Sequence, residues 1–149
     1  VAKPVTYKFE YSASYPSTGE TALVDVLRGS KYFKDGRWQG WINNPAVVTI
    51  DLQELKEVQQ VVVGTLEEQG TGIYFPEELK VEVSQDGTNF QQVAVTTRDY
   101  QTNPGAKIEN FKLDFKKQQA QYLRVTIKPL SETPKGGGAW LFVDEILVN

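Results

Sequence analysis

The sequence from residue 78 to residue 95, ELKVEVSQDGTNFQQVAV, decides the class of fold. In its first half Leu79, Val81 and Val83 alternate with polar residues, which is typical of a strand with one buried face. Asp86 and Gly87 follow, and we expect this pair to supply the positive φ angles that a tight hairpin requires. The second half is again strand-like. The stretch therefore predicts two antiparallel strands joined by a turn.

The same period of two recurs along the chain. In QYLRVTIK, for example, Leu123, Val125 and Ile127 are expected to point inward. We interpret Asp51 to Glu57 as a connection between strands, and no long helix is predicted. About eight strands in one domain imply two packed sheets, because a single sheet would leave an apolar face in water. The predicted fold is an all-β jelly-roll sandwich of about eight antiparallel strands, a single domain over residues 1–149. The strand-like runs are VTYKFEYS, AVVTIDL, EVQQVVVGTL, ELKVEVS, FQQVAVTTR, KIENFKLDF, QYLRVTIKPL and FVDEILVN.

Charge and composition exclude several classes of partner. The net charge is -3, and the cations are dispersed among acids, so we expect no nucleic-acid binding. No run approaches the ~18 apolar residues of a membrane helix, and the N-terminal residues do not resemble a signal peptide. The chain begins at Val1 rather than Met. We therefore expect a processed chain or a domain excised from a larger protein.

Cysteine and histidine are both absent from the sequence. Disulfides, thiolate metal sites and the commonest general base are thereby excluded, and any metal would need oxygen ligands. Adjacent acids such as Asp144 and Glu145 suggest glycoside hydrolysis, which needs two carboxylates around the scissile bond. Neighbours on a strand point to opposite faces, however. We therefore expect no independent catalysis.

Several fragments in a fixed order carry a resemblance to a known family. They are YPSTGETALVDVLRG, GRWQGW, VTIDLQELKEVQQVVV, YFPEELKVEVSQDGTNFQQV, QYLRVTI and VDEILV. In this order they resemble the coagulation factor V/VIII type C domain, also called discoidin-like, whose relatives include family 32 carbohydrate-binding modules and whose fold is galactose-binding-domain-like. The motifs LVD, DGRWQGW and FPEELKVEVSQDG are most similar to those of modules on the C-terminal side of bacterial family 20 β-N-acetylhexosaminidases, or chitobiases.

The resemblance implies a non-catalytic carbohydrate-binding module of an exported bacterial glycoside hydrolase. Its partners would be N-acetylhexosamine- or galactose-containing glycans and the catalytic domain of the same chain, and its location would be secreted, periplasmic or at the cell surface. The alternative is a structural or protein-interaction module that packs on the catalytic domain without binding sugar. Lipid-headgroup binding would need basic loops with apolar tips, which KYFKDGRW offers, but the acidic chain argues against a membrane partner.

The resemblance also implies a structural calcium ion between the first loop and the last strand. A hard cation takes six to eight oxygens, and an irregular loop can turn several carbonyls inward. The family usually has glycine after the loop aspartate, whereas this chain has Val26. A left-handed backbone there would cost a β-branched residue ~1 kcal/mol or more, so we expect the loop to differ locally. The implied ligands are Ala22, Asp25, Leu27, Ser30, Asp144 and Glu145.

The residues from Thr21 to Asn44 hold two of the three tryptophans but show no sustained period. Shallow sugar sites pair exposed rings with planar polar side chains, and loops at one end of a sandwich suit them. Trp38 is expected to belong to the core, and Arg37 either bonds a sugar or pairs with Asp35. Burial of Trp41, Tyr74 and Trp140 together would favour the interaction module, whereas their exposure at one end would favour sugar. The predicted sugar-binding residues are Tyr32, Arg37, Trp41, Asn43, Gln69, Tyr74 and Trp140.

Overall fold

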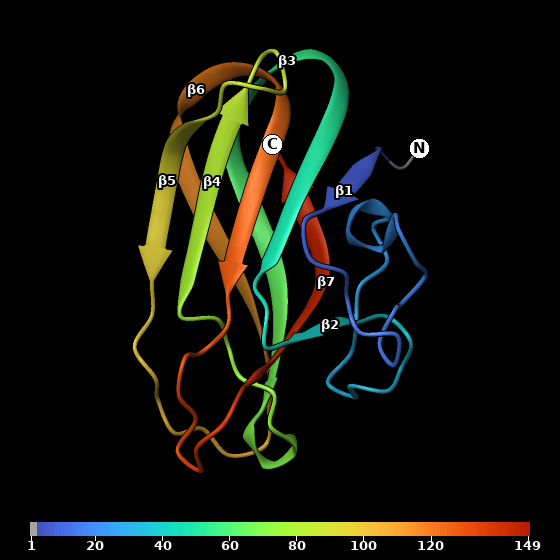
Figure 1. Cartoon of the computed structure of the whole chain (residues 1–149), viewed down its shortest axis with the longest axis vertical. Coiled ribbons are helices and arrows are strands. Elements are labelled where there is room, and N and C mark those ends of the chain that lie inside the picture. Colours follow the sequence, from blue (N-terminus) through green and yellow to red (C-terminus); the bar gives the residue numbers. More distant parts are fainter. Residues whose placement is uncertain (1–2) are drawn as a thin grey trace.

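Two long strands, β3 (Ala46–Glu68) and β6 (Ala106–Lys128), organise the fold. The computed structural model describes residues 3–149. The two strands pair antiparallel from Ala46 opposite Ile127 to Glu68 opposite Ala106. Both bend over at one end of the molecule, so each contributes to both layers of a sandwich (Figure 1). This bend turns one continuous sheet into two facing layers.

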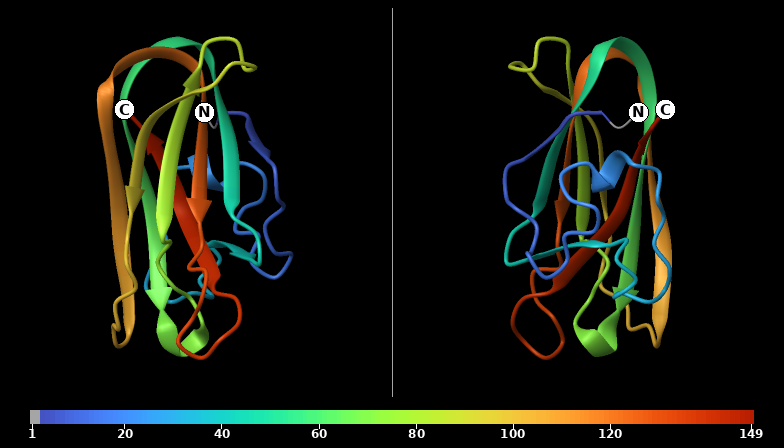
Figure 2. Two further views of the ribbon diagram at one scale, coloured as in Figure 1. Left: turned by 60° about the vertical axis from the view of Figure 1, so that its left-hand side comes forward. Right: turned by 90° about the vertical axis from the view of Figure 1, so that its right-hand side faces the viewer.

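The remaining strands extend these layers on either side. The strand order is β2-β7-β3-β6-β4-β5, with β1 paired to β3. One layer holds β1, β4 and β5, and the other holds β2 and β7 (Figure 2). Two short 3-10 turns are the helical segments of residues 3–149. The bounds are β1 Val5–Tyr7, η1 Ala22–Val24, β2 Gln39–Ile42, η2 Gln69–Thr71, β4 Glu78–Ser84, β5 Gln91–Thr97 and β7 Trp140–Val148.

The bend in β3 lies where the ladder with β6 loses its regular register, between Asp51 and Lys56. Gln53 has φ 71°, and its backbone N–H donates to the Asp51 carboxylate at 2.7 Å. A local side-chain bond of this kind replaces the lost ladder bond and allows the chain to turn. The prediction of a connection from Asp51 to Glu57 was therefore wrong, because the strand continues through the bend.

One apolar core fills the space between the layers. The alternating residues that the sequence marked as inward, such as Leu79, Val81 and Val125, are buried there beside Val63 and Leu141 of the opposite layer. The expected all-β jelly-roll sandwich is confirmed. Within residues 3–149 no helix is long and apolar enough to span a membrane.

Details of the strands differ from the expectation. The eight predicted runs merge into fewer strands, because β3 and β6 each join two of them, while β2 lies in a stretch interpreted as loop. The hairpin between β4 and β5 is present, but of the predicted pair only Gly87 has a positive φ, 78°. Asp86 instead accepts the backbone N–H groups of Thr88 and Asn89 at 2.8 Å. The turn is therefore wider than a two-residue hairpin.

Candidate functional site

The first loop meets the last strand where a cation was expected. The Asp25 carboxylate accepts the Leu27 N–H at 2.9 Å and the Thr18 hydroxyl at 2.6 Å. The Val26 N–H donates to Glu145 Oε1 at 3.1 Å across the domain. A direct hydrogen bond therefore connects the loop to the last strand.

Val26 does adopt the left-handed backbone, with φ 59°. We expected the loop to change so as to avoid this conformation, and the structure contradicts that expectation. The Val26 side chain is 72% exposed, so it clashes with no packed neighbour. The strain of a β-branched residue in this region is retained because the N–H then points at Glu145.

Glu145 is a buried carboxylate with incomplete compensation. It is 2% exposed. Burial, together with the charges of Asp25 and Asp144, raises the pKa of Glu145 to about 8, although the Val26 N–H and Arg28 act against this rise. A carboxyl group in such surroundings favours a proton or a bound cation.

Asp144 is bonded to the same loop through Arg28. The Arg28 Nε and the Gly29 N–H both donate to Asp144 Oδ2, at 2.9 and 2.8 Å, and Arg28 also donates to Asn110. Asp144 Oδ1 is buried and is the one such side-chain atom without a partner among residues 3–149. It faces Gly64, where a β-carbon would overlap it. One carboxylate oxygen of Asp144 is therefore held by Arg28 and Gly29, while the other has no partner. The resemblance implies the Asp144 carbonyl, not its side chain, as the calcium ligand.

The remaining predicted calcium ligands lie in different surroundings. Ala22 lies buried in η1, and Leu27 is exposed beside Asp25. Ser30 is engaged elsewhere, because its carbonyl accepts the Trp38 Nε1–H at 2.9 Å and its hydroxyl bonds Asp35 at 2.7 Å. Within residues 3–149 no three acidic side chains cluster closely enough to hold a metal alone. Any ion here would need carbonyl oxygens as well.

Two of the predicted sugar-binding rings are buried. Trp41 is 1% exposed, packs in the main core and donates its Nε1–H to the Phe9 carbonyl at 3.0 Å. Tyr74 is buried beside Tyr100, with ring centroids 6.1 Å apart. Neither ring offers an exposed face on which a sugar could stack. The prediction that both rings are exposed for sugar binding was therefore wrong. Trp38 is buried as expected.

The other predicted sugar-binding residues do not form one cluster. Gln69 accepts the Tyr100 hydroxyl and donates to the Gln101 carbonyl, so its amide is occupied. Asn43 is exposed near Gly138. The predicted pairing of Arg37 with Asp35 is present only through the Arg37 backbone N–H, at 2.9 Å. Arg37 and Tyr32 are exposed on one loop.

Trp140 is half-buried and belongs to an aromatic cluster that the sequence analysis did not predict. Its ring lies edge-on to Tyr15 at 5.2 Å and to Phe142 at 5.9 Å. Phe33 lies 6.3 Å from Tyr15 and 6.2 Å from Phe142. Four rings from three separate segments thus meet beside the β2–β7 pair.

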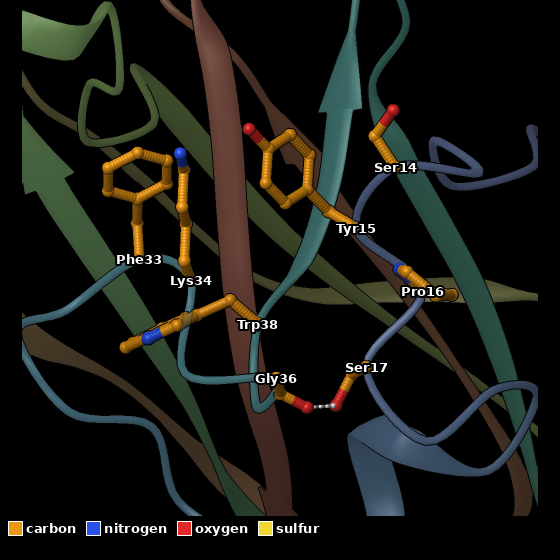
Figure 3. Close-up of a pocket in the computed structure, with 8 residues that line it drawn as sticks. All are labelled: Ser14, Tyr15, Pro16, Ser17, Phe33, Lys34, Gly36 and Trp38. Carbon is orange, nitrogen blue, oxygen red and sulfur yellow. Dashed lines mark hydrogen bonds between the residues drawn. The ribbon is translucent and has the colours of Figure 1, made fainter.

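A hollow of about 430 Å³ opens beside these rings. Figure 3 shows Tyr15 and Phe33 among the residues that line it, with Trp38 below them. The Ser17 hydroxyl donates to the Gly36 carbonyl at 3.2 Å and joins the two loops that form the hollow. Its volume is that of a small-ligand site. The hollow is lined by Ser14, Tyr15, Pro16, Ser17, Phe33, Lys34, Gly36 and Trp38.

A second hollow, of about 540 Å³, lies between residues 43–45 and 126–131. It is larger, but no aromatic ring lines it. Because an exposed ring face is the usual platform for a sugar, we take the smaller, ring-lined hollow as the candidate site.

Comparison with known families agrees with the fold. The sequence profile described as F5/8 type C domain matches residues 6–146. The chain belongs to this family. No curated protein is similar enough to this F5/8 type C domain to count as a relative.

Three of the solved structures similar to this F5/8 type C domain come from named bacteria. Chitosan-binding module 1 of a chitosanase/glucanase from Paenibacillus sp. IK-5 is 21% identical, with TM-score 0.61, covering 100% of this chain and 96% of that chain. CpGH89CBM32-5 from Clostridium perfringens, in complex with GalNAc-β-1,3-galactose, is 18% identical, with TM-score 0.59 and 99% of both chains covered. The C-terminal domain of a Bacteroides fragilis chitobiase is 19% identical, with TM-score 0.56, covering 100% and 95%. At these identities the likeness establishes the fold.

Proposed function

We propose that this F5/8 type C domain is a non-catalytic carbohydrate-binding module. The observation that carries the proposal is the hollow of about 430 Å³, which the half-buried rings of Tyr15 and Phe33 line together with serine hydroxyls. A sugar would place its C–H face on a ring and its hydroxyls on the polar groups. No lining residue is a carboxylate. Glycoside hydrolysis in this hollow would therefore lack its two acids.

The proposal extends to the larger protein. We infer that the module belongs to an exported bacterial glycoside hydrolase, of the β-N-acetylhexosaminidase type, and holds it on glycans that contain N-acetylhexosamine or galactose. The similar folds of a chitobiase C-terminal domain and of a module in complex with GalNAc-β-1,3-galactose support this inference. Weak binding is sufficient, because tethering raises the effective concentration of the enzyme at its substrate.

Replacement of Phe33 by alanine tests the hollow. We expect glycan affinity to fall at least tenfold, about 1.4 kcal/mol, because one of the two ring faces is lost. Binding is measured on a glycan array and then by calorimetry with the best saccharide. Tyr100→Ala is the control, since Tyr100 is an exposed ring outside the hollow.

Both variants must first be shown to be folded, by thermal unfolding. A folded Phe33→Ala domain with unchanged glycan affinity would remove the hollow from the proposal. A folded parent domain that binds no glycan would instead favour the module that packs on its catalytic domain without sugar. Trp41 and Tyr74 are buried as that alternative expects, but Trp140 is only half-buried.

We also propose that a structural calcium ion joins the first loop to the last strand. The carboxylates of Asp25 and Glu145 and the carbonyls of Ala22, Leu27 and Asp144 would hold it. The fit rests on Glu145, a buried carboxylate that accepts the Val26 N–H and feels the negative charges of Asp25 and Asp144, with only partial compensation. A bound calcium ion would supply the missing positive charge. Ser30 is not included, because its oxygens are engaged with Trp38 and Asp35.

The calcium proposal predicts a thermal shift. At a calcium concentration one hundred times the Kd, binding adds about 2.7 kcal/mol, which raises the Tm by roughly 5–10 °C. Glu145→Gln should abolish this shift without lowering stability in chelator, because the amide fits the site but carries no charge. Glu132→Gln, in an exposed loop, should keep the shift. An equal calcium shift in the Glu145→Gln variant would exclude Glu145 as a ligand.

A further inference from the structure

We propose that the hollow selects an anionic saccharide, one that carries a sulfate ester or a uronic carboxylate. This inference rests on the proposed sugar-binding function and adds the charge of the ligand. Its basis is an uncompensated set of cations on the loop that forms one side of the hollow.

The loop from Lys31 to Arg37 reads KYFKDGR, with three cations and one acid. The acid, Asp35, is occupied within the loop: its carboxylate accepts the Ser30 N–H at 2.6 Å, the Ser30 hydroxyl at 2.7 Å and the Arg37 N–H at 2.9 Å. Partial burial acts to raise the pKa of Asp35, but these bonds and the Arg37 charge hold it below its ordinary value. Asp35 is thus ionised, and its negative charge offsets that of Arg37.

Lys31 and Lys34 remain without an acidic partner. The ion pairs of residues 3–149 involve Arg28 and cations of the strands, and none includes a cation of this loop. Both lysines are exposed. In a chain of net charge -3 this loop is therefore a local positive surface.

Lys34 brings that charge to the hollow itself. Its Nζ lies 5.4 Å from the centroid of the Phe33 ring. Figure 3 shows the Lys34 chain beside Phe33 and the Tyr15 hydroxyl across from them. A sugar stacked on Phe33 would therefore bring a sulfate or carboxylate within reach of the ammonium group, while the tyrosine hydroxyl can donate to the same group.

The same geometry opposes a cationic sugar. No lining residue carries a negative charge, so a protonated glucosamine would meet Lys34 without compensation. The similar fold of a chitosan-binding module thus does not carry that ligand to this hollow. A saccharide also fits the site better than an anionic membrane surface, because the charge lies beside a hollow of small-ligand size on an acidic domain.

Paired probes that differ only in charge test the inference by calorimetry. They are galactose 6-sulfate against galactose, and methyl glucuronide against methyl glucoside, measured with the parent domain, Lys34→Gln and Lys135→Gln. We expect at least one acidic probe to bind tenfold or more tightly than its neutral partner. The probe that does so identifies sulfate or carboxylate as the recognised group. Lys34→Gln should reduce that preference to near unity, while Lys135→Gln, in another exposed loop, should keep it.

Other outcomes separate this inference from the proposed function. Equal binding of acidic and neutral probes, or a preference that survives Lys34→Gln, would overturn charge selection but leave sugar binding. Failure of the folded domain to bind any saccharide on the array would overturn both. Binding to phosphatidylserine vesicles without binding to either acidic probe would overturn the inference in favour of a lipid surface.

Discussion

Replacing Trp41 of β2 by alanine is expected to lower the free energy of unfolding by about 3–5 kcal/mol. The ring is 1% exposed and packs against Tyr7 and Tyr11, with centroids 6.2 and 6.4 Å away. Truncation leaves a cavity and also leaves the Phe9 carbonyl without its donor. Urea unfolding followed by tryptophan fluorescence and circular dichroism measures the loss.

Tyr32→Ala is the matched control, because Tyr32 is an aromatic residue of the same region that is 61% exposed. Its removal should change stability by less than about 0.5 kcal/mol. A Trp41→Ala domain of unchanged stability that no longer bound glycans would show that Trp41 reaches the ligand after all. The structure would then be wrong about the side to which this ring points.

Gly64→Ala is expected to destabilise the domain by about 3 kcal/mol, at the upper end of the usual cost of overpacking. A β-carbon at residue 64 would overlap Asp144 Oδ1 and lie 2.5 Å from Arg28 Nη2. Neither can retreat easily, since Asp144 is buried and Arg28 is bonded to both Asp144 and Asn110. The methyl group must therefore break the contact between the first loop and β7 or distort the β3–β7 ladder. Chemical unfolding gives the size of the loss.

Gly70→Ala controls for the general effect of removing a glycine. No atom lies within 4 Å of the position that a β-carbon would take at residue 70, and its φ is not positive. The stability should therefore stay within about 0.5 kcal/mol of the parent. Equal stability of both alanine variants would mean that the Arg28–Asp144 pair is not held as the structure shows.

The period of two predicted the sandwich because it reports which face of a strand is buried. It identified Leu79, Val81 and Leu123 as core without knowledge of their partners. The same signal could not locate the bend of β3, because the exposed residues from Gln53 to Leu55 look like a loop although pairing resumes at Lys56. It also missed β2, in which Gln39, Gly40 and Trp41 are all buried and no alternation remains.

The sequence predicted less of the candidate site than of the fold. Exposure of a ring depends on which segment packs over it. Residue type and position in an apparent loop therefore could not show whether Trp41 is buried or is an exposed ring that binds sugar. Tyr15 lies in a serine- and proline-containing stretch with no period and meets Phe142 only through the pairing of β2 with β7. The expected closeness of the first loop to Glu145 came from family resemblance, since 119 residues separate Val26 from that carboxylate.

The order of the strands has a consequence for biosynthesis. The last strand, β7, lies between β2 and β3, so β2 gains its ladder partner only when Trp140 pairs with Ile42. At about 5–20 residues per second a ribosome needs roughly 5–20 s to make the intervening chain. During that interval the first loop has neither Asp144 nor Glu145 to bond. The ring-lined hollow is thus assembled after translation of the domain is almost complete, and a nascent chain that stops before β7 should fail to bind glycans.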